Sequence, residues 1–169
     1  AGIIPVLSGL AAGNLILVAA FTLLIVLGDR ITGGQATARQ LLPRFAPTIL
    51  PIALAYHTAH YLPSLLVDGQ YVLMVLNDPF NTGANLLGRD EFYVTTGFFN
   101  HRETMRIIWL SQALVIVAGH VLAVVLAHAQ ALHLYRNLQR AFVAGLPLAI
   151  FMILYTWLGL WLLAAPKGG

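Results

Sequence analysis

The sequence predicts an all-α integral membrane protein, a bundle of four transmembrane helices with both termini outside. Composition is the first observation: 59% of the 169 residues are hydrophobic and 9% are charged, whereas soluble globular chains carry about 25% charged residues. The second observation is the mean hydropathy of +0.82, which also indicates a largely apolar chain. The third observation is four separate apolar stretches, each near the roughly 20 residues that cross a hydrocarbon core. No domain boundary interrupts them, so we expect residues 1–169 to form a single membrane domain.

Cysteine and charge exclude several classes of protein. The sequence has no cysteine, which excludes disulfides, thiolate nucleophiles and cysteine-ligated metal sites. The net charge is +3, but the arginines are dispersed along the chain and form no basic stripe, so we expect no nucleic-acid partner. The expected environment is the lipid bilayer, with the chain as a multi-pass protein of the cell inner membrane.

The first expected span is residues 3–27, which carry no charge. Gly9 and Gly13 lie four residues apart in it, a pair that allows another helix to approach closely. Residues 29–44 follow as a polar connection. The second span, residues 47–67, begins at Pro47, and proline is favoured in a first helical turn. Pro63 cannot donate a hydrogen bond to the carbonyl of Ala59, so we expect a loosened turn there.

A long outer loop, residues 77–106, connects the second span to the third, residues 107–135. Small residues recur every four positions in the third span and predict a packing stripe against other helices; they are Gly119, Ala123, Ala127 and Ala131. A tight turn bracketed by Arg136 and Arg140 leads to the fourth span, residues 142–164.

Arginine asymmetry predicts the orientation. The two short connections on one side of the membrane hold five arginines against the single acid Asp29; they are Arg30, Arg39, Arg44, Arg136 and Arg140. Positive residues concentrate on the cytoplasmic side. Both termini and the long loop are therefore expected outside.

Four histidines lie inside the second and third spans. His57 and His60 are three residues apart and share a helix face, and His120 and His128, eight residues apart, also share one. Counting about 1.5 Å per residue from the inner helix ends gives His60 and His120 nearly the same depth. A polar ring at membrane depth must be paired, ligated or solvated, so these residues predict a site.

Three uses of the histidines fit the sequence. The first is a transition metal ion, with zinc, copper or iron left open, bound by His57, His60 and His120, with His128 as a distant ligand or part of a second position. The second is a b-type haem between His60 and His120, in an electron-transfer membrane subunit. The third is no cofactor: the imidazoles hydrogen-bond other groups and hold helices together in a non-catalytic accessory subunit of a larger complex.

The remaining polar residues offer little to a catalyst. Asp68, near the outer end of the second span, is the one acid near enough to serve as a general base for a metal-activated water. His101 and His133 lie in the outer loop and at the inner membrane edge, where surface roles are expected.

The stretch Ala55-Tyr56-His57-Thr58-Ala59-His60-Tyr61, the segment from Asn77-Asp78-Pro79-Phe80 to Gly88, and the segment from Gly119-His120 to Ala127-His128 together resemble a known family. They are similar to the C-terminal portion of the fenitrothion hydrolases, multi-spanning bacterial membrane proteins. The resemblance covers about residues 47–165. It implies metal-assisted hydrolysis of an organophosphate triester, with His57, His60, His120 and His128 as site residues. Members are longer, so the resemblance implies that this chain is a C-terminal piece or a short relative. The expected partners are other membrane subunits or a missing N-terminal part.

Overall fold

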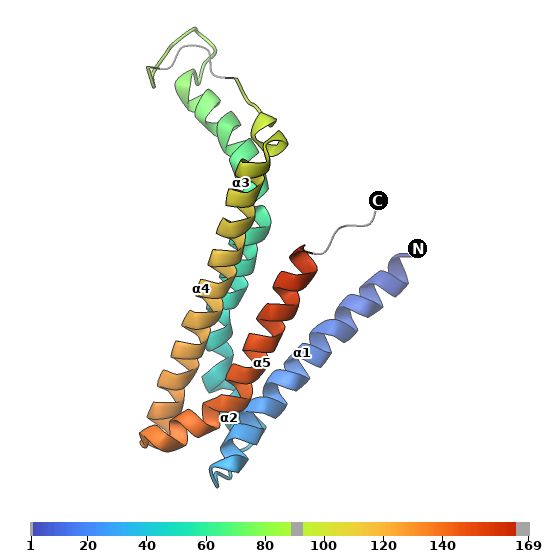
Figure 1. The fold of residues 1–169 in the computed structure, drawn as a ribbon, viewed down its shortest axis with the longest axis vertical. Coiled ribbons are helices and arrows are strands. Elements are labelled where there is room, and N and C mark those ends of the chain that lie inside the picture. The colour runs from blue at the N-terminus through green and yellow to red at the C-terminus, as the bar shows by residue number, and fades with distance from the viewer. Residues whose placement is uncertain (1, 89–92, 165–169) are drawn as a thin grey trace. The chain divides into compact units, whose positions relative to one another are not determined.

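The computed structural model describes residues 2–88 and 93–164, with side chains up to Trp161. Every regular element in this part of the chain is helical (Figure 1). The elements are α1 (Ile3–Ile31), α2 (Ala38–Phe45), the 3-10 turn η1 (Ala46–Ile49), α3 (Leu50–Asn77), the 3-10 turn η2 (Gly97–Asn100), α4 (Arg102–Tyr135) and α5 (Leu138–Ala164). The expected all-α class is therefore confirmed.

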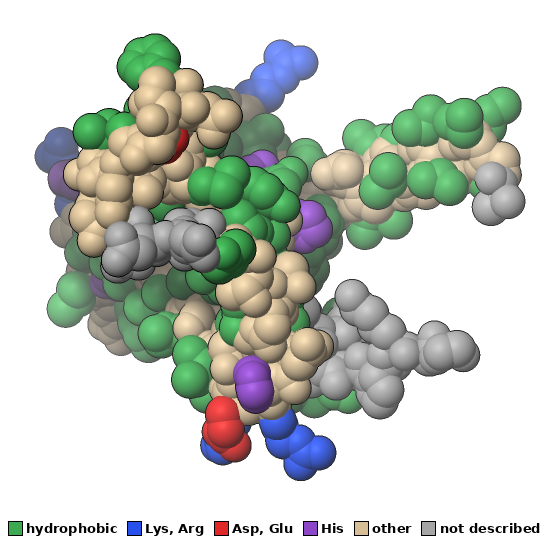
Figure 2. All heavy atoms as spheres, turned by 90° about the horizontal axis from the view of Figure 1, so that it is seen from above, with side chains coloured by type: hydrophobic (Ala, Val, Ile, Leu, Met, Phe, Trp, Pro, Cys, Tyr) green, Lys and Arg blue, Asp and Glu red, His purple; other side chains and the backbone are tan. Residues whose placement is uncertain are grey.

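Three of these helices are long and apolar enough to cross a membrane: α1, α4 and the segment Leu138–Trp161 of α5. Helix α3 has 28 residues but is not among them. Two histidines and Asp68 lie along it and lower its hydropathy. Much of the apolar side-chain area stays exposed, including that of Ile4 and Leu15, which are 81% and 71% exposed. Figure 2 shows hydrophobic side chains over much of the surface seen from one end.

Several expected boundaries differ from those in the structure. Helix α1 continues through Asp29 to Ile31, and half of the connection expected at residues 29–44 is the helix α2. The Thr37 N–H donates to the Gln40 side chain at 2.9 Å, which satisfies a backbone donor at the start of α2.

Helix α3 begins at Leu50 and continues to Asn77, beyond the end of the second expected span at residues 47–67. Only part of the loop expected at residues 77–106 is therefore loop, since α4 already begins at Arg102. Residues 89–92 of that loop lie outside the described residues. Helix α4 ends at Tyr135, where the third expected span ends.

The chain divides into two compact units, residues 1–52 with 119–169, and residues 53–118. We call them unit 1 and unit 2. Unit 1 contains α1, α2, the second half of α4 and α5. Unit 2 contains nearly all of α3, the loop that follows it and the first half of α4.

The core of unit 1 is built where α1, α2, α4 and α5 meet. The expected stripe on α4 is its packing face, because Ala123, Ala127 and Ala131 are all buried in this core. The other core residues are Phe21, Ile25, Leu41, Phe45, Ala141, Leu148 and Met152. Small side chains on α4 leave room for these larger ones, which is how the stripe contributes to packing.

Helices α1 and α5 contact each other within unit 1, and Gly28 lies directly against α5. A Cβ atom added there would collide with the backbone of Ala144 in α5. The predicted glycine pair is different, since a Cβ at Gly9 or Gly13 would meet no atom of the described chain within 4 Å. The residues from Ile3 to Ala19 are exposed throughout, so within the described chain α1 packs through residues 20–31.

The turn between α4 and α5 has the predicted tight form. Arg136 adopts a left-handed conformation with φ of 51°. The Asn137 side chain then accepts a hydrogen bond from the Arg140 N–H at 3.0 Å, which caps the start of α5. The two helices therefore begin and end within three residues of each other.

Candidate functional site

The four candidate histidines are divided between the two units. His57 and His60 belong to unit 2, and His120 and His128 belong to unit 1. Within neither unit do the described residues bring three His, Asp or Glu side chains close enough to hold a metal ion. Each pair is therefore described by itself.

His57 and His60 lie on an exposed polar face of α3. Both imidazoles are exposed, and both contact the Tyr61 ring edge-on, with centroid distances of 5.9 and 5.0 Å respectively. Ser64 and Asp68 continue the same face one and two turns further along, and both are exposed. These five residues, His57, His60, Tyr61, Ser64 and Asp68, are called the α3 polar face below. The opposite face, with Ala55 and Ala59, is buried.

The carbonyl that Pro63 leaves without its helical donor has a partner on α4. The Gln112 side-chain amide donates to the Ala59 oxygen at 2.8 Å. A side-chain amide from the neighbouring helix thus replaces the missing backbone N–H. This hydrogen bond ties α3 to α4 inside unit 2 and explains why α3 continues through Pro63 without ending. Because Gln112 is the donor to the Ala59 carbonyl, neither His57 nor His60 fills that position.

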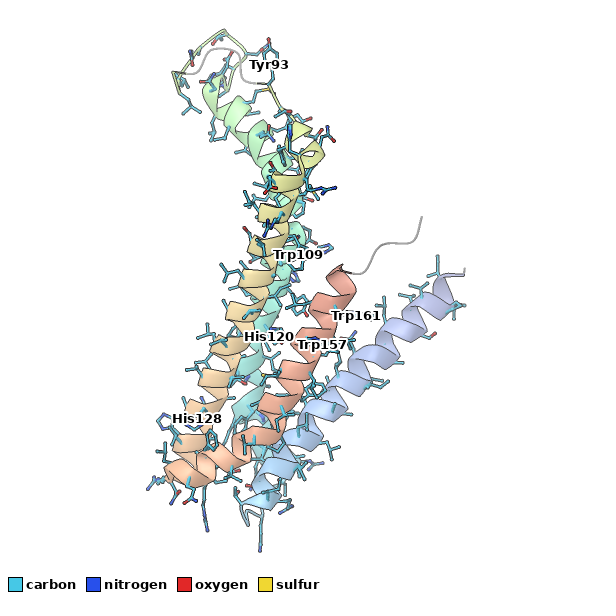
Figure 3. The ribbon with its side chains drawn as sticks, viewed as in Figure 1. Tyr93, Trp109, His120, His128, Trp157 and Trp161 are labelled. Carbon is cyan, nitrogen blue, oxygen red and sulfur yellow. The ribbon has the colours of Figure 1, made fainter. Side chains whose placement is uncertain are left out.

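His120 and His128 lie on the half of α4 that belongs to unit 1 (Figure 3). His120 is 6% exposed, in agreement with its position next to the packing stripe. His128 is half-buried, and its ring meets Phe142 of α5 edge-on at a centroid distance of 6.5 Å. Eight residues of helix separate the two imidazoles by about 12 Å along the axis. One ion cannot be reached easily by both.

Asp29 is a buried polar residue that sequence reasoning treated only as a loop charge. It lies in the last turn of α1 and is 2% exposed. One carboxyl oxygen accepts from the Tyr135 hydroxyl at 2.8 Å, and the other accepts from the Ala36 N–H at 2.9 Å. A Cβ at Gly34 would collide with this carboxyl group, which would have to move away from its position in the structure. The sequence feature that could have indicated this role is a single acid followed by Gly33-Gly34 in an arginine-rich connection.

The Asp29 contacts also locate the arginines of unit 1. The Tyr135 hydrogen bond brings the end of α1 next to the end of α4. Both arginine-bearing connections are therefore at the same end of unit 1. All five arginines in them are exposed.

Asp78 organises the loop that follows α3. Its carboxyl oxygens accept hydrogen bonds from the Thr82 N–H at 2.9 Å and the Gly83 N–H at 2.7 Å. The Thr82 backbone hydrogen bond is the largest influence and lowers the pKa of the Asp78 carboxyl; desolvation opposes it, and the Gly83 hydrogen bond adds to it. Gln70 pairs with the backbone N–H and carbonyl of Thr95, at 2.8 and 2.9 Å, and holds the far side of the loop against α3.

The remaining expected site residues are exposed. His101 precedes α4 and His133 lies in its last turn, and both imidazoles are at the surface. Asp68 is exposed on α3, eight residues beyond His60 and therefore about 12 Å away along the axis. That separation disfavours Asp68 as a base acting at the His60 ring.

No family model, curated protein or solved structure matches the chain. The resemblance to the fenitrothion hydrolases therefore remains a prediction based on the quoted segments.

Proposed function

We propose that the chain is a multi-pass protein of the inner membrane with an intramembrane histidine site for a transition metal ion. The observation that carries this proposal is the α3 polar face. Five polar side chains line one face of a helix whose neighbouring helix, α4, is long and apolar enough to cross a membrane. Exposed imidazoles in hydrocarbon cost several kcal/mol unless they are ligated or paired.

Helix α3 is the fourth span in this proposal. Its 28 residues extend about 42 Å, which exceeds the hydrocarbon thickness of about 30 Å. The Gln112 hydrogen bond to Ala59 joins it to α4 about a third of the way along α3. The arginines gathered at one end of unit 1 favour the orientation with that end in the cytoplasm and both termini outside.

His57 and His60 would supply two ligands of the ion from one turn of α3. His120 and His128 are candidate ligands from the sequence alone, and their separation of about 12 Å along α4 fits two metal positions better than one shared ion. The ring contacts of His57 and His60 with Tyr61 hold both imidazoles on one side of the helix, an arrangement that suits a shared ligand. Imidazole nitrogens are ligands that suit zinc, copper and iron.

The family resemblance suggests that the proposed metal site hydrolyses a phosphotriester. A bound metal ion would act as a Lewis acid toward the phosphoryl oxygen. The chain itself would orient the ligands and supply a proton acceptor. A histidine that does not bind the metal suits that task better than Asp68, because of the axial distance from His60.

Elemental analysis of the purified full chain, together with a reduced-minus-oxidised optical spectrum, tests the proposal. We expect about one metal ion per chain and no Soret band. The double variant His57→Ala, His60→Ala should lose the metal, whereas the control His133→Ala, at an exposed position on α4, should keep it.

A Soret band that disappears in the His60→Ala variant would overturn the proposal of a simple metal ion and would indicate a b-type haem. Absence of both metal and haem in a correctly inserted protein would overturn the proposal in favour of the accessory subunit. In that case the α3 polar face would be a surface for another polypeptide.

A further inference from the structure

Unit 1 contains a cavity between the second half of α4 and the first half of α5. Its volume is about 360 Å³, within the range of small-molecule sites. It exists because Ala127, Gly145 and Ala149 are small, while Phe142 and Met152 bound it. A Cβ added at Gly145 would meet no described atom within 4 Å, which agrees with open space beside that residue.

His128 is the one polar side chain in the lining. Its ring is held edge-on to Phe142 and is half-buried, and no hydrogen bond of this imidazole is present within the described residues. A neutral imidazole carries one N–H donor. A ligand in the cavity would therefore meet apolar walls and a single hydrogen-bond donor.

The entrance faces the apolar surface of the helices. Val125 and Phe142 are lining residues that are 57% and 59% exposed. If α4 and α5 span the membrane, these side chains are in hydrocarbon. A ligand then enters from the lipid and must be uncharged, because an unpaired charge is too costly there.

We propose that this cavity binds an uncharged, lipid-soluble ring compound with a carbonyl oxygen, the chemistry of a quinone. The carbonyl accepts the His128 N–H, and the ring contacts the edge of Phe142 and the Met152 sulfur, both of which favour aromatic partners. A lipid acyl chain would match the walls but leave the imidazole donor without an acceptor, at a cost of 1–3 kcal/mol. The proposal involves only unit 1 and does not depend on a metal ion at His57 and His60, although it uses His128, the candidate for a second metal position.

Equilibrium binding of radiolabelled 2-methyl-1,4-naphthoquinone to the full chain in lipid nanodiscs tests this inference. We expect one saturable site per chain. The compound 2-methylnaphthalene has the same ring system without carbonyl groups. It should compete about threefold to tenfold more weakly than unlabelled 2-methyl-1,4-naphthoquinone, which is the range for one hydrogen bond.

Two variants and one control complete the test. His128→Phe should weaken quinone binding by about threefold to tenfold, because it keeps a ring but removes the donor. Ala149→Phe should abolish binding by filling the cavity. His133→Phe, at an exposed histidine five residues away on the same helix, should bind the quinone as the unchanged protein does.

Absence of a saturable site would overturn the inference. So would equal competition by 2-methylnaphthalene combined with unchanged binding by His128→Phe, since the cavity would then hold only apolar material such as lipid chains. The metal content of these samples is measured separately, so loss of quinone binding with retained metal distinguishes this inference from the proposed metal site.

Discussion

Asp29 and the α3 polar face are two polar regions on helices that are otherwise mostly apolar, and they differ in burial and in hydrogen bonding. Asp29 in unit 1 is buried, and both of its carboxyl oxygens accept hydrogen bonds. The imidazoles of His57 and His60 in unit 2 are exposed, and both contact the ring of Tyr61. Asp29 thus holds unit 1 together, whereas the α3 polar face is available to something outside the described chain.

This difference separates a structural role from a functional one. A buried carboxyl group whose two oxygens both accept hydrogen bonds contributes to stability and is not available to bind a ligand. Exposed imidazoles contribute little to stability and keep their nitrogens available. The predictions below test this distinction by comparing matched substitutions in the two regions.

Removing the Asp29 carboxyl group should have the largest effect. Asp29→Ala leaves the Tyr135 hydroxyl and the Ala36 N–H without their acceptor, and we expect the free energy of unfolding to fall by about 2–4 kcal/mol. Denaturant unfolding in detergent micelles, followed by circular dichroism, measures this change. The control is Asp68→Ala, which removes an exposed acid from α3 and should cost less than about 0.5 kcal/mol. Equal losses for the two variants would contradict the comparison.

Gln112→Leu should have the next largest effect. It removes the donor to the Ala59 carbonyl, and we expect a loss of about 1 kcal/mol. The same substitution made together with Pro63→Ala should cost less than half as much, because the alanine N–H can then donate to that carbonyl within α3. The cycle of single and double variants measures this coupling by unfolding. Gln130→Leu, at an exposed glutamine of α4, is the control, and additive losses in the cycle would argue against the role of Pro63.

Replacing the exposed histidines should change stability least among the helix substitutions. In protein stripped of metal by a chelator, we expect His57→Phe and His60→Phe each to stay within about 0.5 kcal/mol of the unchanged protein, because neither ring is buried. His120→Phe is the matched buried case and should cost more than about 1 kcal/mol. Thermal unfolding of the three variants in the same detergent measures the difference. A large loss for His57→Phe would mean that its ring belongs to the core.

The smallest effect is expected in the Asp78 loop. Its hydrogen bonds with Thr82 and Gly83 lower the pKa of the carboxyl group below the ordinary 3.8, so the unfolded loop binds a proton more readily. The stabilisation is therefore complete above pH 3.8 and is lost as the pH falls through the lower folded pKa. Amide signals of Thr82 and Gly83 in nuclear magnetic resonance spectra should titrate below that value. Asp78→Asn should abolish the titration, and a midpoint above 3.8 would contradict the assignment.

Much of the fold could be predicted because helix periodicity and apolar length are local properties. The all-α class, the stripe ending at Ala131 and the tight turn at Arg136 all follow from residues close together in the sequence. The bounds of α3 were less predictable. Pro63 and Asp68 indicate an early end, and the Gln112 amide that allows the helix to continue comes from a residue 49 positions away from Pro63.

The candidate site was predicted in part for the same reason. Helical spacing correctly indicates that His57 and His60 share a face and that His120, next to the stripe, is buried. The metal, the haem and the hydrolytic activity remain predictions. The role of Asp29 and the cavity beside His128 depend on residues from different helices, so spacing along one helix could not reveal either.

The sequence by itself determined that the chain is helical and largely apolar, and which helix faces carry small or polar side chains, since these follow from local composition and a period of 3.6 residues. Only the tertiary structure decided which polar groups are buried with partners and which stay exposed. Burial depends on contacts between distant segments, and a hydrogen bond such as that from Tyr135 to Asp29 forms only when packing brings its two ends together.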